Sequence, residues 1–194
     1  MRTTLLLLLF LLLCTCVPAQ ELVQPELDLH SERVAHQRTA MLVLGGWAVG
    51  NIGLGLALRA NTTGETRRFH EMNAIWNVVN LGIAGFGYYT ALREPATLGV
   101  FAALQKEQTF QKVLLFNAGL DVGYLLGGLY LLERGRRPEV DADRLRGYGK
   151  AVLLQGGFLF VFDLVNYFVA SGRNDGYGLL LGAVGEGVGL RWSF

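Results

Sequence analysis

Four long stretches of apolar residues, each bounded by charged residues, divide the chain. They cover about residues 39–59, 72–92, 113–132 and 151–172. Each is about 20 residues long, the length that an α-helix needs to cross roughly 30 Å of hydrocarbon. Between their bounding charges, the first two contain no charged residue, and the third and fourth contain only Asp121 and Asp163. The pattern therefore predicts an all-α integral membrane protein, with a four-helix bundle over residues 39–172.

The first residues have the pattern of a secretory signal peptide over residues 1–19. Arg2 precedes the apolar run Leu5–Leu13, and small residues close the segment at Ala19. The apolar run is too short to span a bilayer. We expect cleavage after Ala19 rather than lipidation at Cys16, because the residue before that cysteine is bulkier than the usual Gly or Ala. Cleavage would remove both cysteines of the chain and with them any disulfide or thiolate metal site.

The charges between the apolar stretches predict an orientation in the membrane. An exported N-terminus would place the loops 59–71 and 133–150 in the cytoplasm. These loops are richer in Lys and Arg than the longer opposite flanks, as the positive-inside rule requires. We therefore expect a multi-pass protein of the bacterial inner membrane, with both termini outside the cytoplasm.

The flanks of the four stretches carry weaker patterns. We expect a short amphipathic helix in the exported segment 20–38 and an interfacial helix in the connection 94–111, starting near Pro95. The tail 173–194 is too short and too rich in glycine for a fifth span. It is expected to lie at the membrane interface, anchored by Trp192.

Polar residues form a stripe along the predicted helices. They are Asn51 on the first, His70, Asn73, Asn77 and Asn80 on the second, Asn117 and Asp121 on the third, and Gln155, Asp163 and Asn166 on the fourth. At 100° per residue, the four on the second helix fall within about an 80° arc. A carboxylate near the bilayer centre costs about 2.5–3.5 kcal/mol on insertion scales, so such groups normally face a bundle interior. We expect the stripes to face one another as a polar seam.

This seam has a structural and a functional interpretation. Hydrogen bonds between membrane helices contribute about 0.6 kcal/mol each on average, and we expect this role for the asparagines and Gln155. Asp121 and Asp163 are the stronger candidates for a ligand site or proton path, because an ionisable residue inside a membrane suggests function by default. His70 is expected near the cytoplasmic end, as an interfacial or capping residue.

Glycines spaced four residues apart predict close contacts between helices. Gly46 and Gly50 form one such motif in the first stretch, and Gly119, Gly123 and Gly127 form a repeated one in the third. Small residues at this spacing let two helix backbones approach. We expect these glycines to pack against helices, or against a partner or a second copy of the chain.

Composition supports the membrane class and excludes several functions. Hydrophobic residues make up 52% and charged residues 17% of the chain, and the mean hydropathy is +0.34; soluble domains carry about 25% charged residues. The net charge of +1 offers no footprint for nucleic acid. The sequence contains no phosphate-binding loop, no His-Glu-x-x-His and no Gly-x-Ser-x-Gly motif, so no catalytic residue is assigned.

No cofactor or metal is expected either. A haem held by two histidines would need a second intramembrane histidine besides His70. A metal held by His70, Asp121 and Asp163 has suitable ligand types, but His70 lies at a different depth in the predicted bundle.

Three segments together resemble an uncharacterised family of small multi-pass bacterial membrane proteins, a domain of unknown function. They are FHEMNAIWNVVNLGIAGFG, NAGLDVGYLLGGLYLLERG and LQGGFLFVFDLVNY, and the resemblance covers about residues 38–172. It implies a four-helix membrane domain and carries over no catalytic role.

Two functional hypotheses follow from the sequence. In the first, the chain is a binding, interaction or structural component of the membrane, whose polar seam sets helix register and whose glycine faces dock a partner or a second copy. In the second, it is a small proton-coupled transporter or channel that uses Asp121 and Asp163. Four helices are few for alternating access unless the protein dimerises, which ranks the transporter second.

Overall fold

A computed structural model describes residues 20–187 of the chain and the side chains of residues 28–182. In this range the chain is all-α, as predicted, with five helices and no strand. The helices are α2 (Gln20–Ala60), α3 (Gly64–Leu92), α4 (Val100–Arg134), α5 (Ala142–Ser171) and α6 (Asn174–Gly187). The expected signal peptide and Trp192 lie outside the described residues.

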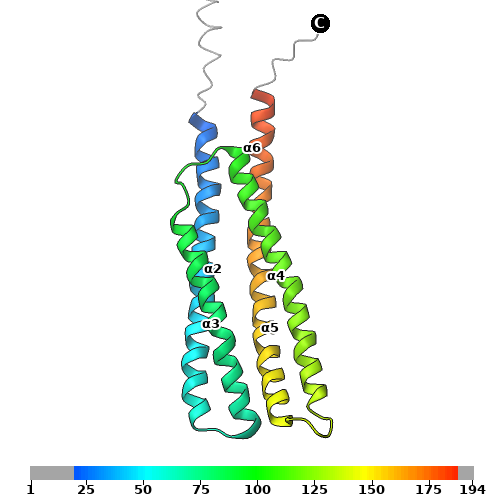
Figure 1. The fold of residues 1–194 in the computed structure, drawn as a ribbon. Helices are drawn as coiled ribbons and strands as arrows, with labels where there is room; N and C mark the ends of the chain where they lie inside the picture. The colour runs from blue at the N-terminus through cyan, green and yellow to red at the C-terminus, as the bar shows by residue number, and fades with distance from the viewer. Residues whose placement is uncertain (1–19, 188–194) are drawn as a thin grey trace, which may run out of the picture.

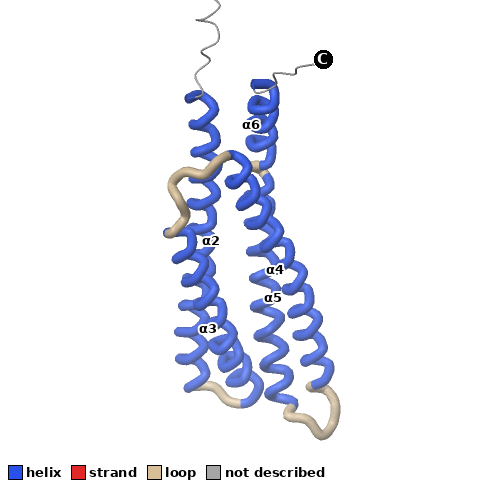
Figure 2. The backbone as a smooth tube through the Cα atoms, turned by 45° about the horizontal axis from the view of Figure 1, so that its top comes forward, coloured by secondary structure: helices blue, strands red, loops and turns tan. Residues whose placement is uncertain are grey.

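The long helices form two antiparallel hairpins that stand side by side (Figures 1 and 2). Helix α2 packs along α3 in one hairpin, and α4 packs along α5 in the other. Contact between the hairpins runs mainly through α3 and α5, whereas α3 and α4 barely touch. Helix α6 continues the direction of α5 after a short break at Gly172 and Arg173. The side of the bundle between α3 and α4 is therefore open, because these two helices make few contacts with each other.

Two of these helices begin at a residue that favours the start of a helix. Gly64, the first residue of α3, has φ +57°, a left-handed conformation that glycine adopts without strain. Asp141 caps α5, because its side chain accepts a hydrogen bond of 3.0 Å from the backbone N–H of Arg144. Short connections at both places force each pair of helices into an antiparallel hairpin.

The helices extend beyond the boundaries that the charges predicted. Residues 20–38 belong to α2 rather than to a separate helix, and most of the connection 94–111 forms the first turns of α4. Part of the tail forms α6. The difference has a physical reason. Charged residues were expected to lie in water beyond the helix ends, but Glu107 and Arg173 are buried against each other at the end of the bundle where α4 begins and α5 ends. A charged residue therefore does not mark the end of a helix there.

Three helical segments are long and apolar enough to cross a membrane, namely Asp28–Ala60, Val100–Arg134 and Ala142–Gly182. The sequence predicted four spans, and α3 is the one outside this set. Asn73, Asn77 and Asn80 lower its hydropathy, although its 29 residues are sufficient in length. Its outward face is nonetheless apolar, since the side chains of Ile75 and Val78 are 54% and 61% exposed.

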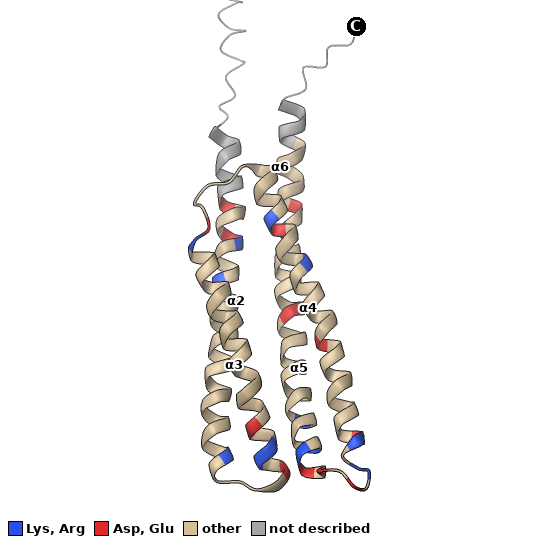
Figure 3. Cartoon of the chain, in the orientation of Figure 1, with Lys and Arg blue, Asp and Glu red and all other residues tan. Residues whose placement is uncertain are grey.

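Charged residues gather at the two ends of the helices (Figure 3). At the end that holds the α2–α3 and α4–α5 connections, Glu65 of α3 forms ion pairs with Arg146 at 3.1 Å and Lys150 at 2.5 Å on α5. These pairs tie the two hairpins together where the helices leave the apolar region.

Close approach of helices depends on other glycines than those of the predicted motifs. A Cβ added at Gly46, Gly50, Gly119, Gly123 or Gly127 would meet nothing within 4 Å. Within the chain, therefore, these five glycines make no close helix contact. They lie on outward faces, because the polar stripe occupies the inner face of each helix. Their packing against a second copy stays a prediction.

The tight contacts lie instead at glycines outside those motifs. A Cβ on Gly128 of α4 would lie 3.0 Å from the carbonyl oxygen of Gly149 on α5, and a Cβ on Gly149 would lie 2.8 Å from that of Gly128. A Cβ on Gly147 would approach the carbonyl oxygen of Glu65 on α3 to 2.5 Å. Because backbone atoms cannot move aside, these positions require glycine.

We expect Gly128→Ala to lower the free energy of unfolding by about 1–3 kcal/mol, the usual cost of overpacking a close contact. Its neighbour Gly127 is the matched control, because Gly127→Ala adds a methyl group to open space and improves helix propensity. Thermal unfolding of both variants in the same detergent measures the difference. Equal melting temperatures would contradict the close α4–α5 contact.

Candidate functional site

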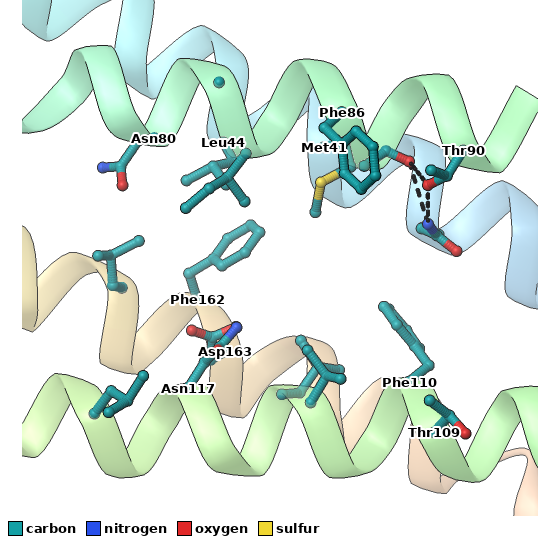
Figure 4. Close-up of a pocket in the computed structure, with 18 of the residues that line it drawn as sticks. Met41, Leu44, Asn80, Phe86, Thr90, Thr109, Phe110, Asn117, Phe162 and Asp163 are labelled. Carbon is teal, nitrogen blue, oxygen red and sulfur yellow. Dashed lines mark hydrogen bonds between the residues drawn. The ribbon is translucent and has the colours of Figure 1, made fainter.

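A cleft of about 1270 Å³ lies between α3 and α4, with α2 and α5 forming its inner wall (Figure 4). Ligand sites commonly measure about 300–1,000 Å³, so the cleft is large enough for a lipid-sized molecule. Most of its wall is apolar or aromatic and includes Met41, Leu44, Phe86, Phe110 and Phe162. It follows the side of the bundle that α3 and α4 leave unsealed.

Polar residues occupy two separate places along this cleft. Asn80, Asn117, Asp121 and Asp163 form a central group, and Arg33, Glu94 and Lys106 form an outer group. Lys106 and Asp121 lie fifteen residues apart on α4, which corresponds to about 22 Å along a helix. The cleft is therefore amphipathic along its length, with a largely apolar wall between the two groups that also includes Gln37, Thr90 and Thr109.

The central group contains a pair of carboxyls. Asp121 of α4 and Asp163 of α5 are 2% and 5% exposed, and their carboxyls are in hydrogen-bonding contact. Two carboxylates accept hydrogen bonds but donate none, so this contact requires a proton on one of the two residues. Asn117, drawn beside Asp163 in Figure 4, also hydrogen-bonds to Asp163. No amide or hydroxyl donor among the described residues reaches Oδ2 of Asp121, which is buried.

The outer group is an ion cluster at the end of the cleft. Glu94, in the connection between α3 and α4, lies 3.2 Å from Arg33 and 2.7 Å from Lys106. Burial acts to raise the pKa of Glu94, but the hydrogen bond from Lys106 and the charge of Arg33 outweigh it and hold the pKa below its usual value. His30 donates from Nε2 to the backbone oxygen of Pro95 at 2.9 Å, which holds this connection against α2.

A network of amides joins α2, α3 and α5 behind the cleft. Trp47 donates from Nε1 to Oε1 of Gln155 at 2.8 Å, and Gln155 donates in turn to Oδ1 of Asn73. Asn73 donates to Oδ1 of Asn51 at 2.6 Å, and Asn51 donates to the backbone oxygen of Trp47 at 2.8 Å. The ring closes through Trp47. Each amide thus has a partner inside the protein, as a lipid surrounding requires.

Asn77 and Asn80 extend this network toward the cleft. Asn77 donates to the backbone oxygen of Asn73 at 2.8 Å, and Asn80 donates to Oδ1 of Asn77 at 3.4 Å. Asn80 is the member of this stripe that also lines the cleft. The stripe of α3 therefore connects the structural network to the central group.

A second buried network ties together α2, α4, α5 and the start of α6. Glu107, which is fully buried, accepts two hydrogen bonds of 2.9 Å from Arg173. Arg173 also donates to Nδ1 of His36 at 3.3 Å, and Nε2 of His36 donates to Oδ1 of Asn166 at 2.8 Å. These two contacts require a neutral imidazole with its proton on Nε2. Gln111 adds a hydrogen bond of 2.8 Å to Asn174.

The structure divides the predicted seam into three parts. Asn73, Asn77 and Gln155 form the amide network, and Asn80, Asn117, Asp121 and Asp163 line the cleft. Asn166 belongs to the second buried network. His70 lies outside all three; its ring contacts Phe69 edge to face.

Several residues of these networks were not predicted from the sequence. They are Arg33, His36, Glu107, Gln111 and Arg173. The sequence predicted an interfacial helix in the connection 94–111, but a buried seam continues through this segment from Asp121. Its members recur every three or four residues: Ala103, Glu107, Gln111, Leu114, Ala118 and Asp121. That periodicity was the available signal.

The arrangement offers acid–base and binding chemistry. The carboxyl pair can hold or release a proton and can balance a positive charge, and the apolar walls can hold a hydrophobic body. Among the residues whose side chains are described, no three His, Cys, Asp or Glu residues gather as a metal site.

We expect Asn73→Ala to lower the free energy of unfolding by about 1–2 kcal/mol, because it removes both side-chain hydrogen bonds of Asn73 between helices. Asn61→Ala is the control, since Asn61 is exposed and bonds only to the backbone of its own turn at 3.0 Å. Equilibrium unfolding in mixed micelles compares the two. A loss no larger for Asn73→Ala than for Asn61→Ala would show that the network does not stabilise the bundle.

Comparison with known proteins gives a family and no function. A sequence model described as a family of unknown function, DUF6992, matches residues 43–164. No curated protein and no solved structure matches the chain. The matched range contains the amide network of Trp47, Asn51, Asn73 and Gln155 and the carboxyl pair of the cleft. The chain belongs to this family of unknown function, DUF6992.

Proposed function

We propose that this chain is a multi-pass protein of the bacterial inner membrane, exported at its N-terminus by a cleaved signal peptide, that binds an amphiphilic molecule between α3 and α4. The three apolar segments support a membrane location. The α3–α4 cleft carries the proposal, because it combines apolar walls with two separate polar groups. α3 would be the fourth span, with its asparagines turned toward α2 and α5.

The membrane surrounding makes such a cleft a binding site. Lipid hydrocarbon can pack against the apolar residues of the cleft but offers no hydrogen bond to Asn80, Asn117 or the carboxyl pair. A molecule with both an apolar body and a polar group satisfies both parts of the wall. The opening between α3 and α4 would admit such a molecule from the lipid, without passage through water.

Occupancy of the cleft is tested with a pair of glycines on α3. Gly82 lines the cleft and Gly85 does not, and a Cβ on either would meet nothing within 4 Å. We expect native mass spectrometry of the protein, extracted gently from its own membrane, to show a bound small molecule. Gly82→Phe should lose it, because the ring fills the cleft, and Gly85→Phe should retain it. A bare wild-type chain, or equal occupancy in both variants, would overturn the proposal.

A proton-coupled carrier is the second candidate function, and the Asp121–Asp163 contact favours it. A carboxyl pair that holds one proton inside a membrane is a group that a proton gradient could load and unload. In proteoliposomes with an imposed pH gradient, we expect proton flux into the lumen that Asp163→Asn abolishes. Flux equal to that of protein-free liposomes would refute the carrier and leave the binding function in place.

A further inference from the structure

The charge balance inside the cleft points to a class of ligand, and this inference rests on the proposed binding function. With one proton between them, Asp121 and Asp163 carry a net charge of −1. The cleft's other charged residues are Arg33, Glu94 and Lys106, in the outer group, and Lys106 lies about 22 Å from Asp121 along α4. Among the described residues, the partners of this pair are Asn117 and the two carboxyls themselves, and none is a Lys, Arg or His.

A lone negative charge in this position lacks the partner that such charges normally have. Charged residues within membrane spans almost always pair with one another or with polar groups of the protein. Asn117 supplies one hydrogen bond, to Asp163. Asp121 is 2% exposed, lines the cleft, and has its Oδ2 buried beyond the reach of any amide or hydroxyl donor of the described chain. The carboxyl pair therefore has no positively charged partner, and both of its residues line the space that a ligand would occupy.

The walls around the pair suit a cation rather than a neutral polar group. Trp76 and Tyr124 line the same part of the cleft and pack edge to face, with ring centroids 4.8 Å apart. Phe162 precedes Asp163 on α5, and its ring projects into the cleft (Figure 4). Aromatic faces attract cations, and the attraction strengthens when water is excluded.

We propose that the central part of the cleft binds a hydrophobic organic cation, such as a lipophilic amine, whose charge lies against Asp121 and Asp163 and whose apolar body lies along the aromatic wall. Binding would replace the missing positive partner of the carboxyl pair. The outer group, with two cations and one carboxylate, would repel the same ligand and so keep its charge at the centre.

Two ions of matched shape and opposite charge test this assignment. Tetraphenylphosphonium and tetraphenylborate are added to the wild-type protein in phosphatidylcholine nanodiscs. Equilibrium dialysis measures how much more of each ion binds to these nanodiscs than to empty nanodiscs of the same composition. We expect the phosphonium to bind at least about tenfold more tightly than the borate, because a buried carboxylate favours one charge and penalises the other. This comparison uses the unaltered chain and needs no variant to fold.

Variants then locate the charge that matters. The double variant Asp121→Asn, Asp163→Asn keeps two groups able to hydrogen-bond, and it should lose about tenfold or more in phosphonium affinity with no loss for the borate. Asp143→Asn, on α5 but outside the cleft, is the control and should bind the phosphonium as wild type does.

The outcomes separate the two levels of the proposal. Borate binding as tight as phosphonium binding, or a double variant that binds the phosphonium like wild type, would overturn the assignment of a cation. Even then, the cleft would remain a binding site if native mass spectrometry showed an endogenous molecule on the wild-type protein and none on Gly82→Phe. No excess binding of either ion, together with a bare chain in native mass spectrometry, would overturn both.

Discussion

The hydrogen bond from Gln155 to Asn73 joins the two hairpins of this protein, and much of the remaining architecture depends on it. The bond links α5 to α3, the principal contact between the hairpins. In hydrocarbon no water replaces a lost partner, so the amides of α2, α3 and α5 have to find one another. Trp47 and Asn51 complete the ring and fix the rotation of α2. The side chains that face inward are thereby decided for three helices at once.

This constraint also explains where the cleft lies. With α3 turned toward α2 and α5 to satisfy its asparagines, it presents to α4 a face of apolar side chains, including Val79, Ile83 and Phe86. Helix α4 packs on α5 through Gly128 and Gly149, where the backbones come close. Trp76 of α3 packs edge to face on Tyr124 of α4, but no hydrogen bond or ion pair among the described residues joins the two helices, so most of the space between them stays open. The position of the cleft therefore depends on which helices are joined by hydrogen bonds and close packing.

The buried Glu107–Arg173 pair stabilises the opposite end of the bundle from the ion pairs of Glu65. Glu107 is fully buried and accepts two charge-assisted hydrogen bonds, so loss of either partner would leave an uncompensated charge. His36 and Asn166 extend this pair to α2 and α5. The network holds α6 in line with α5 and sets the position of the first turns of α4, and with them the outer group of the cleft.

Hydrophobic pattern alone determined the all-helical class, the apolar segments of the chain and the stripe of Asn73, Asn77 and Asn80, because each of these is a local property of periodicity. The same pattern placed Asp121 and Asp163 at similar depth, which made a contact between them foreseeable. Tertiary structure alone decided which glycines pack closely, since Gly119 and Gly128 differ only in what stands opposite them. It also decided that Asn166 joins His36 rather than the seam, and that α3 and α4 part to form a cleft. The close glycine contacts, the partner of Asn166 and the position of the cleft all depend on which helices are neighbours. Contacts between residues far apart in the chain determine the neighbours, and a local sequence pattern does not specify them.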